Sequence, residues 1–216
     1  MKKILIMFLI LFITCSFTAH ATDSYSFLSG GYQLTRVAQN GMGQYFNDRY
    51  NNSEGSKDLH GLYFRGSWNF YGNFFAEYRS GITTRSSTTL KQDYLAFGYY
   101  IPLKDQTSIY ASAGYASYNA ERDVSSCNIF TDNDCTKSTF EEDDNGFSAE
   151  VGLRYKLLRW LQIEPSYRYA DFGQHEVRLT NLIEFSQHSA LELNTGYRHW
   201  EKLDENYFQV GYRYSF

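Results

Sequence analysis

The chain has 216 residues, a formal net charge of −4, a mean hydropathy of −0.49 and 19% aromatic residues, but only 2 Pro. The acidic balance excludes nucleic acid as an expected partner, because that interaction needs a basic patch, and it argues against simple electrostatic binding to anionic lipid. A sequence so rich in aromatics yet hydrophilic on average must spread its apolar groups by alternation, which favours β-sheet over membrane-spanning helices.

The N-terminal 21 residues have the layout of a secretory signal peptide. Residues 2–3 are lysines, residues 4–13 are apolar, and residues 19–21 read Ala-His-Ala, the small-x-small pattern of a cleavage site. The apolar run is too short to cross about 30 Å of hydrocarbon as a helix. We therefore expect an exported chain whose mature part, residues 22–216, forms one domain.

Behind this leader, ten segments alternate between apolar and polar residues with the period of a β-strand, and each has about the length of a membrane-crossing strand. They are residues 25–36, 59–70, 74–84, 92–101, 107–120, 146–157, 161–171, 176–186, 190–200 and 206–216. Pro165 interrupts the seventh segment, and a bulge is predicted there because proline cannot donate to the ladder.

The alternate positions that form the apolar face of these segments contain no Lys, Arg, Asp or Glu in mid-segment. The exceptions Arg36, Asp93 and Asp171 lie at segment ends. A charge at the bilayer midplane costs roughly 2–4 kcal/mol, so this exclusion favours a lipid-facing sheet over a soluble β-sandwich. Trp68 and Trp160 lie near segment ends, where an interfacial aromatic girdle is expected. Trp200 also lies at an end, but on the opposite parity.

The links between segments alternate in length. Those after the second, fourth, sixth and eighth segments are short, whereas long polar links, residues 37–58 and 121–145, follow the first and the fifth. Outer-membrane barrels have short periplasmic turns and longer extracellular loops. We therefore predict an all-β fold, a closed antiparallel transmembrane up-and-down β-barrel. Ten strands are favoured, because an even count returns both chain ends to one side, and eight remain an alternative.

Two cysteines of the mature chain, Cys127 and Cys135, lie in the second long link. The oxidising periplasm favours a disulfide between them, and no His or further Cys lies nearby to complete a metal site. The acidic run at residues 141–144 lacks the spacing of an EF-hand. We therefore expect neither a metal ion nor a cofactor.

The polar face of the alternating segments contains unusually many charged residues. Its charged residues are Arg65, Arg79, Arg154, Lys156, Arg168, Arg178, Arg198 and Arg213, and Glu77, Glu150, Glu164, Glu176, Glu184 and Glu192. This is close to charge balance, and the interior of a small barrel can be filled by side chains. An interior ion-pair core is therefore favoured over a selective channel, because each buried charge needs a partner.

Catalysis in such a barrel would need a His and a Ser within hydrogen-bond reach and a third group to orient them. The mature chain offers His60, His175, His188 and His199. His188 precedes a serine, but neighbours on a strand point to opposite faces. We therefore expect no catalytic residue and no enzyme activity.

The alternating stretch GFSAEVGLRYKLLRWLQIEPSYRYADFG and the tail YFQVGYRYSF resemble the OmpA/OmpX-type outer-membrane β-barrel family over most of the mature chain. The resemblance implies a place in the cell outer membrane among lipid and lipopolysaccharide. It also implies that the barrel assembly machinery reads the terminal aromatic Phe216, supported by Tyr212 and Tyr214. The size and layout are more weakly similar to the accessory colonisation factors of enteric pathogens.

The long links are the expected functional surface, because binding residues concentrate on loops held by a rigid scaffold. Residues 41–58 are rich in Tyr, Asn, Gly and Ser, which make adaptable contacts. Surface recognition of the adhesion or colonisation type, with host surface molecules as partners, is the leading function. The alternatives are a structural envelope barrel or small channel without a specific ligand, and least of all a lipid-modifying enzyme or protease.

Overall fold

The computed structural model describes residues 25–37, 58–85, 87–103, 107–127, 135–200 and 203–216, so the predicted leader and most of the first long link lie outside the described residues. Ten antiparallel strands are present. They are β1 (Phe27–Val37), β2 (Asp58–Tyr71), β3 (Phe74–Arg85), β4 (Thr88–Pro102), β5 (Thr107–Cys127), β6 (Cys135–Leu158), β7 (Leu161–Ala170), β8 (Gln174–Glu184), β9 (Ser189–Trp200) and β10 (Leu203–Ser215). The predicted closed barrel of ten strands is confirmed, and the eight-strand alternative is wrong.

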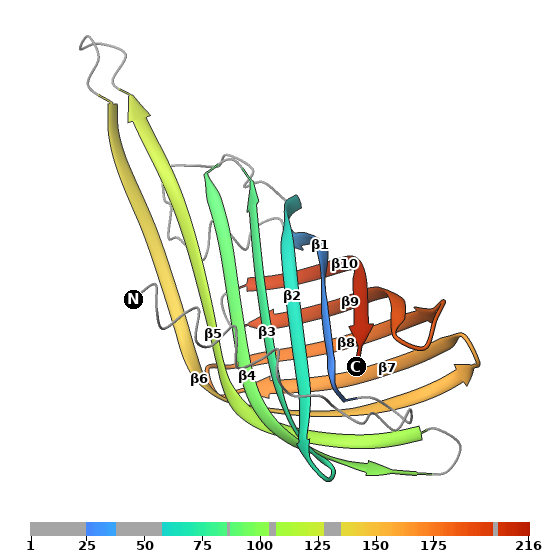
Figure 1. Ribbon diagram of the computed structural model, residues 1–216. Coiled ribbons are helices and arrows are strands. Elements are labelled where there is room, and N and C mark those ends of the chain that lie inside the picture. The colour runs from blue at the N-terminus through green and yellow to red at the C-terminus, as the bar shows by residue number, and fades with distance from the viewer. Residues whose placement is uncertain (1–24, 38–57, 86, 104–106, 128–134, 201–202) are drawn as a thin grey trace, which may run out of the picture.

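Each strand pairs with its neighbours in sequence, and β1 pairs with β10 to close the sheet. Closure leaves no open edge around the wall, which is the condition for a sheet in lipid, where unpaired backbone groups find no water. In Figure 1 the strands β2–β6 cross β7–β10 behind them at a steep angle. This crossing follows from the strand tilt that barrel closure requires.

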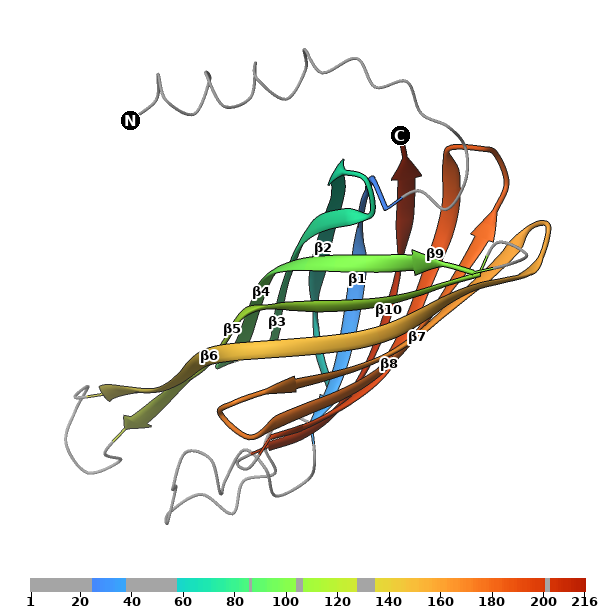
Figure 2. The ribbon, with the colours of Figure 1, turned by 90° about the horizontal axis from the view of Figure 1, so that it is seen from below.

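The two rims of the barrel differ. The first pair of the closing ladder is Phe27 with Ser215, so the start of β1 and the end of β10 lie at one rim, here called the chain-end rim. This rim also holds the two-residue turn between β2 and β3, where Gly72 has a φ of 52°, as tight hairpins require. The opposite rim, here called the hairpin rim, holds the end of β5 and the start of β6 (Figure 2).

The strands β5 and β6 run far beyond their neighbours as a two-stranded hairpin (Figure 1). Their ladder continues without a register shift from Thr107–Tyr155 to Cys127–Cys135, whereas β4 stops pairing at Arg122 and β7 at Ser148. The expectation of a loop over residues 121–145 was therefore wrong. Outside the membrane a hairpin needs backbone pairing but no apolar face. The polar sequence of this region therefore lacks the alternation that identified the other strands.

The bulge predicted at Pro165 was also wrong. Pro165 pairs with Leu179 of β8 in unbroken register, and the register between β6 and β7 is the same on both sides of the proline. The irregularity in that ladder lies instead between Lys156 and Leu158, next to the turn.

The apolar face of each strand forms the outer surface of the barrel, where its large side chains are exposed. Trp68 is 42% and Trp160 is 51% exposed, and both lie toward the chain-end rim. Asp93, expected at a segment end, lies inside β4 because that strand begins already at Thr88, and it accepts a hydrogen bond from the hydroxyl of Tyr78 at 2.7 Å. No helix among the described residues is long and apolar enough to cross a membrane.

Candidate functional site

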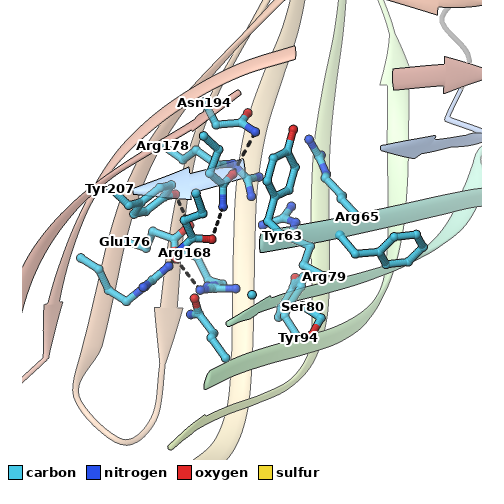
Figure 3. Close-up of a pocket in the computed structure, with 16 residues that line it drawn as sticks. Tyr63, Arg65, Arg79, Ser80, Tyr94, Arg168, Glu176, Arg178, Asn194 and Tyr207 are labelled. Carbon is cyan, nitrogen blue, oxygen red and sulfur yellow. Dashed lines mark hydrogen bonds and ion pairs between the residues drawn. The ribbon is translucent and has the colours of Figure 1, made fainter. Parts of the chain in front are cut away.

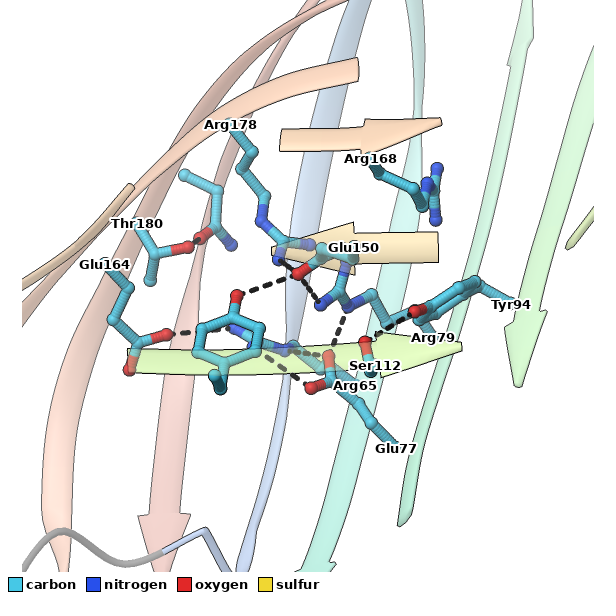
Figure 4. A network of polar contacts seen from close by, with 12 residues as sticks. Arg65, Glu77, Arg79, Tyr94, Ser112, Glu150, Glu164, Arg168, Arg178 and Thr180 are labelled. Carbon is cyan, nitrogen blue, oxygen red and sulfur yellow. Dashed lines mark hydrogen bonds and ion pairs between the residues drawn. The ribbon is translucent and has the colours of Figure 1, made fainter. Parts of the chain in front are cut away.

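The middle of the barrel is filled by a layer of ion pairs. Glu150 of β6 is one of its central carboxylates (Figure 4). It accepts hydrogen bonds from Arg79 at 2.6 and 2.7 Å, from Arg178 at 3.0 Å and from the hydroxyl of Tyr110 at 2.8 Å. Arg79 also contacts Glu77 of its own strand. Four strands of the wall are thus tied together through one buried carboxylate.

Glu164 of β7 joins a second group of cations toward the chain-end rim. Arg213 contacts it at 2.9 Å, Arg65 at 3.4 Å and Arg154 at 3.5 Å. Arg213 also contacts Glu192 at 2.6 Å. The guanidinium of Arg65 binds Glu77 at 2.7 Å, which connects this group to the first.

Glu176 of β8 organises the part of the layer nearer the hairpin rim. It contacts Arg168, and it accepts from Arg198 at 3.0 Å and from the hydroxyl of Tyr207 at 2.8 Å. Arg198 also pairs with Glu205 of β10. Lys156 and Glu184 form a separate, partly exposed pair at 2.6 Å.

Apolar clusters close the charged layer at both ends. Toward the hairpin rim lies a cluster of Val37, Leu59, Leu90, Tyr118, Ala120, Trp200 and Leu203. Toward the chain-end rim, Tyr25, Phe75 and Tyr110 form a second cluster, in which the ring of Tyr25 stacks on Tyr100 at 4.0 Å. Arg154 lies 3.6 Å from the centre of the Tyr25 ring, so the aromatic cluster covers the ion pairs directly.

A small cavity remains inside the charged layer. It measures about 40 Å³, room for a few water molecules at most, since a water needs about 10–15 Å³ on this measure. Figure 3 shows its two walls, with Tyr63, Arg65 and Arg79 on one side and Arg178 and Tyr207 on the other. In its described part, the barrel therefore has a largely filled interior with a small residual cavity.

The histidines do not form a catalytic arrangement. His60 contacts Tyr32, His175 contacts the hydroxyl of Tyr167 at 2.7 Å, His188 contacts the carbonyl of Ser215 at 2.8 Å, and His199 contacts Asp204. Each has a partner other than a serine side chain. Within the described ranges, no three residues of the His, Cys, Asp and Glu types are placed to hold a metal ion.

The β5–β6 hairpin is strongly acidic. Residues 121–144 contain eight acidic and two basic residues, which equals the whole formal charge of residues 22–216. The carboxylate of Glu141 accepts from Asn119 at 2.7 Å, and Asp123 accepts from Thr139 at 2.8 Å, across the ladder. Glu141 and Asp143 are exposed. The hairpin therefore presents a concentrated negative surface beyond the barrel.

Cys127 and Cys135 face each other as the last pair of the β5–β6 ladder, while their side chains lie outside the described part. Directly opposed residues of an antiparallel ladder have Cα atoms about 4.5–5.5 Å apart, inside the range of disulfides. We propose that the two are joined.

Replacing both cysteines with serine should leave the barrel assembled but open the hairpin tip to protease. The chain-entropy model gives the bridge about 2.5 kcal/mol for such a short loop, all of it local to the tip. Limited proteolysis with mass analysis should show cleavage within residues 121–144 only in the variant. Two free thiols titrated in denatured, unreduced protein would show that no bridge exists.

Sequence reasoning missed three features of the interior. Trp200 was noted only as lying at a segment end on the opposite parity, and it is buried, 2% exposed, in the cluster at the hairpin rim. Trp200 lies two residues after Arg198 and therefore on the same face of the strand. That shared face was the signal in the sequence that Trp200 points inward. Glu205 was missed because its strand was started at residue 206, and Tyr25 was assigned no role although it anchors the other cluster.

The C-terminal aromatics lie on the outer face. Tyr212 is 50% and Tyr214 is 46% exposed, and the hydroxyl of Tyr212 contacts Ser189 at 2.7 Å. The backbone N–H of Phe216 donates to the carbonyl of Ser26 at 3.1 Å. The last residue is therefore held against the first strand at the chain-end rim.

The sequence matches a family model described as an outer membrane protein β-barrel domain over residues 7–216. No curated protein matches the sequence. Among solved structures, Ail, the attachment invasion locus protein of Yersinia pestis, is similar with a TM-score of 0.44 and 12% identity, covering 90% of this chain and all of that one. OprG from Pseudomonas aeruginosa gives 0.40 and 12%, covering 92% and 99%. The outer membrane protease OmpT from Escherichia coli gives 0.46 and 8%, covering 89% and 95%.

Proposed function

Because the chain belongs to the outer membrane protein β-barrel family, we propose that it is a surface-recognition protein of the cell outer membrane. The proposed function is attachment of the adhesion or colonisation type, in which the β5–β6 hairpin binds a basic patch on a host surface molecule. The observation that carries it is the projection of this hairpin beyond every neighbouring strand (Figure 2).

The position of the hairpin supports this role. Outer-membrane barrels place short turns in the periplasm and long connections outside the cell, so the hairpin rim faces the exterior. Beyond the Ser148–Ala170 pair, the outer part of β6 still pairs with β5, but among the described strands none pairs with its other edge. Exposed strand edges bind partners through their backbone, and acidic side chains along the edge oppose pairing with a second copy of the same hairpin.

The charge of the hairpin defines the chemistry of the partner. Eight acids in 24 residues would repel polyanions and attract a lysine- or arginine-rich surface. Complementary charge raises the rate of encounter most at low salt, and screening shortens its reach to about 8 Å at physiological ionic strength. Attachment through this surface should therefore weaken steadily as salt is added.

Removing charge from the hairpin should reduce attachment of cells to a host monolayer. A variant with Asp123→Asn, Glu141→Gln and Asp143→Asn keeps the shape of these exposed side chains and removes three charges. We expect it to bind severalfold more weakly than the parent at low salt and to lose most of the salt dependence. Asp58→Asn, which changes an acid at the same rim outside the hairpin, is the matched control and should attach normally.

Equal attachment by the parent, the charge variant and cells without the protein, at equal amounts of folded barrel, would reject recognition by the hairpin. The structural envelope barrel would then be the better description. Loss of attachment in the Asp58→Asn control as well would place recognition elsewhere on the rim.

The small-channel alternative predicts that the barrel conducts ions, whereas the filled interior predicts that it does not. Barrels with aqueous lumens have about 16–18 strands, whereas this interior is filled by ion pairs and closed by apolar clusters at both ends. Purified, refolded protein in planar bilayers should therefore show no steady conductance steps. Large, reproducible steps would contradict the filled interior and promote the channel.

A further inference from the structure

The charged layer of the barrel does not balance. Thirteen charged side chains meet in it, each at most 12% exposed, and they are seven arginines and six glutamates. They are Arg65, Arg79, Arg154, Arg168, Arg178, Arg198 and Arg213, and Glu77, Glu150, Glu164, Glu176, Glu192 and Glu205. The layer therefore carries one positive charge in excess.

The other charged side chains of the described interior lie outside this layer. The pair of Lys156 and Glu184 is internally neutral. The hairpin adds the buried Arg122 and the inward-facing acids Glu142 and Asp144, which sum to one negative charge. The two acids lie opposite Ala120 and Tyr118 of the apolar cluster toward the hairpin rim, and neither is buried.

Proton exchange cannot remove the excess. An arginine keeps its charge in proteins, and protonation of a glutamate would only make the layer more positive. An unpaired buried charge carries a large desolvation cost. The apolar clusters at both ends separate the layer from bulk water. The negative charge of the hairpin group lies at the apolar cluster toward the hairpin rim, so a balancing charge within the layer itself would have to come from outside the chain.

The cavity within the layer is the place where such a charge can bind. Its charged lining consists of five arginines and one glutamate, namely Arg65, Arg79, Arg168, Arg178, Arg198 and Glu176. Three nitrogen donors on the lining have no hydrogen-bond acceptor, the Nε atoms of Arg168 and Arg178 and the Nε2 of Gln92. Arg168 is 3% and Arg178 is 6% exposed, so solvent does not reach these donors.

The distribution of carboxylates explains why the excess falls there. Glu150 already binds Arg79 through both oxygens and shares one of them with Arg178 and Tyr110. Among the described residues, the carboxylate oxygen that Arg178 contacts is therefore one that it shares with two other donors. Glu176 is divided in the same way between Arg168, Arg198 and Tyr207.

We propose that this cavity binds one small monovalent anion of the size of chloride. The volume of about 40 Å³ accommodates such an ion and excludes a sugar or a nucleotide. An anion accepts hydrogen bonds from all the free donors at once and neutralises the layer. The site is independent of the proposed attachment function and concerns the stability of the barrel.

Bromide provides a direct test on the unmodified protein. Crystals grown in sodium bromide should show an anomalous peak in the cavity beside Arg168 and Arg178. Unfolding by urea, followed by tryptophan fluorescence at constant ionic strength, should respond when bromide replaces gluconate, which is too large for the cavity. Above the dissociation constant, each tenfold increase in bromide should raise the folded-to-unfolded ratio about tenfold.

Arg178→Gln provides the test by mutation, because it makes the layer neutral. Its urea midpoint should no longer depend on bromide, whereas Arg36→Gln, an exposed arginine at the hairpin rim, should keep the full dependence. Bromide peaks on the outer surface only, or equal unfolding in bromide and gluconate, would overturn the proposal. If Arg178→Gln does not fold, the anomalous map and the anion dependence of the unmodified barrel still decide it.

Discussion

Replacing Glu150 with glutamine should lower the free energy of unfolding of the barrel by about 3–5 kcal/mol, the usual cost of removing one partner from a buried ion pair. Glutamine keeps the shape of the side chain, so little of the loss comes from packing. Arg79 loses two charge-assisted hydrogen bonds and Arg178 loses its carboxylate. Neither arginine can release its proton, so both remain charged in the interior.

Urea unfolding of the refolded protein in detergent micelles measures this loss. Asp58→Asn is the control, because the Asp58–Arg36 pair has the same chemistry at 2.7 Å but side chains that are 32% and 67% exposed. Solvent screens such a pair, and its removal should leave the unfolding free energy nearly unchanged. Equal, small losses in both variants would show that the charged layer does not stabilise the barrel.

A double variant separates charge from shape. Arg178→Gln added to Glu150→Gln restores the original excess of one positive charge in the layer. If charge imbalance causes the loss, the double variant should be more stable than Glu150→Gln alone, with a coupling energy that direct contacts commonly show. Additive losses would attribute the effect to the individual hydrogen bonds instead.

The wall of the barrel could be predicted because lipid imposes a strict rule on it. One face of each strand must be apolar, so the alternation marked the segments 59–70 and 74–84 within one residue of β2 and β3. The rule weakens where a strand leaves the membrane. The outer parts of β5 and β6 have no face of alternating apolar residues. For that reason the acidic run at residues 141–144 was interpreted as part of a loop.

The interior could be predicted only as a set of residues. Parity identified which side chains point inward, but it gives no information about which carboxylate meets which arginine across the barrel. Glu164 contacts Arg65 from a strand on the opposite wall, a pairing set by tilt and stagger. The apolar clusters that close the two ends were missed for a related reason, because Tyr25 and Trp200 are far apart in sequence and each resembles a girdle residue when considered alone.

Deleting Phe216 should reduce the amount of protein in the outer membrane severalfold. The resemblance to small outer-membrane barrels assigns the terminal aromatic to the assembly machinery. The structure adds a local reason, since the N–H of Phe216 donates to Ser26 and that of Ser215 to His188 at the chain-end rim. Loss of the residue removes both the recognition group and one of the contacts that fasten β10 beside the start of the chain.

The measurement is the quantity of folded, heat-modifiable protein in outer-membrane fractions from cells with equal synthesis. Deletion of Asn51, one residue of the first long link, is the matched control and should not change that quantity. Phe216→Tyr, which retains a terminal aromatic ring, should restore most of it. Because the β1–β10 ladder runs over eleven residue pairs, loss of the final contact alone cannot unfold the barrel. A severalfold drop on deletion, restored by tyrosine, would therefore show recognition during assembly, and an unchanged yield would reject that role for Phe216.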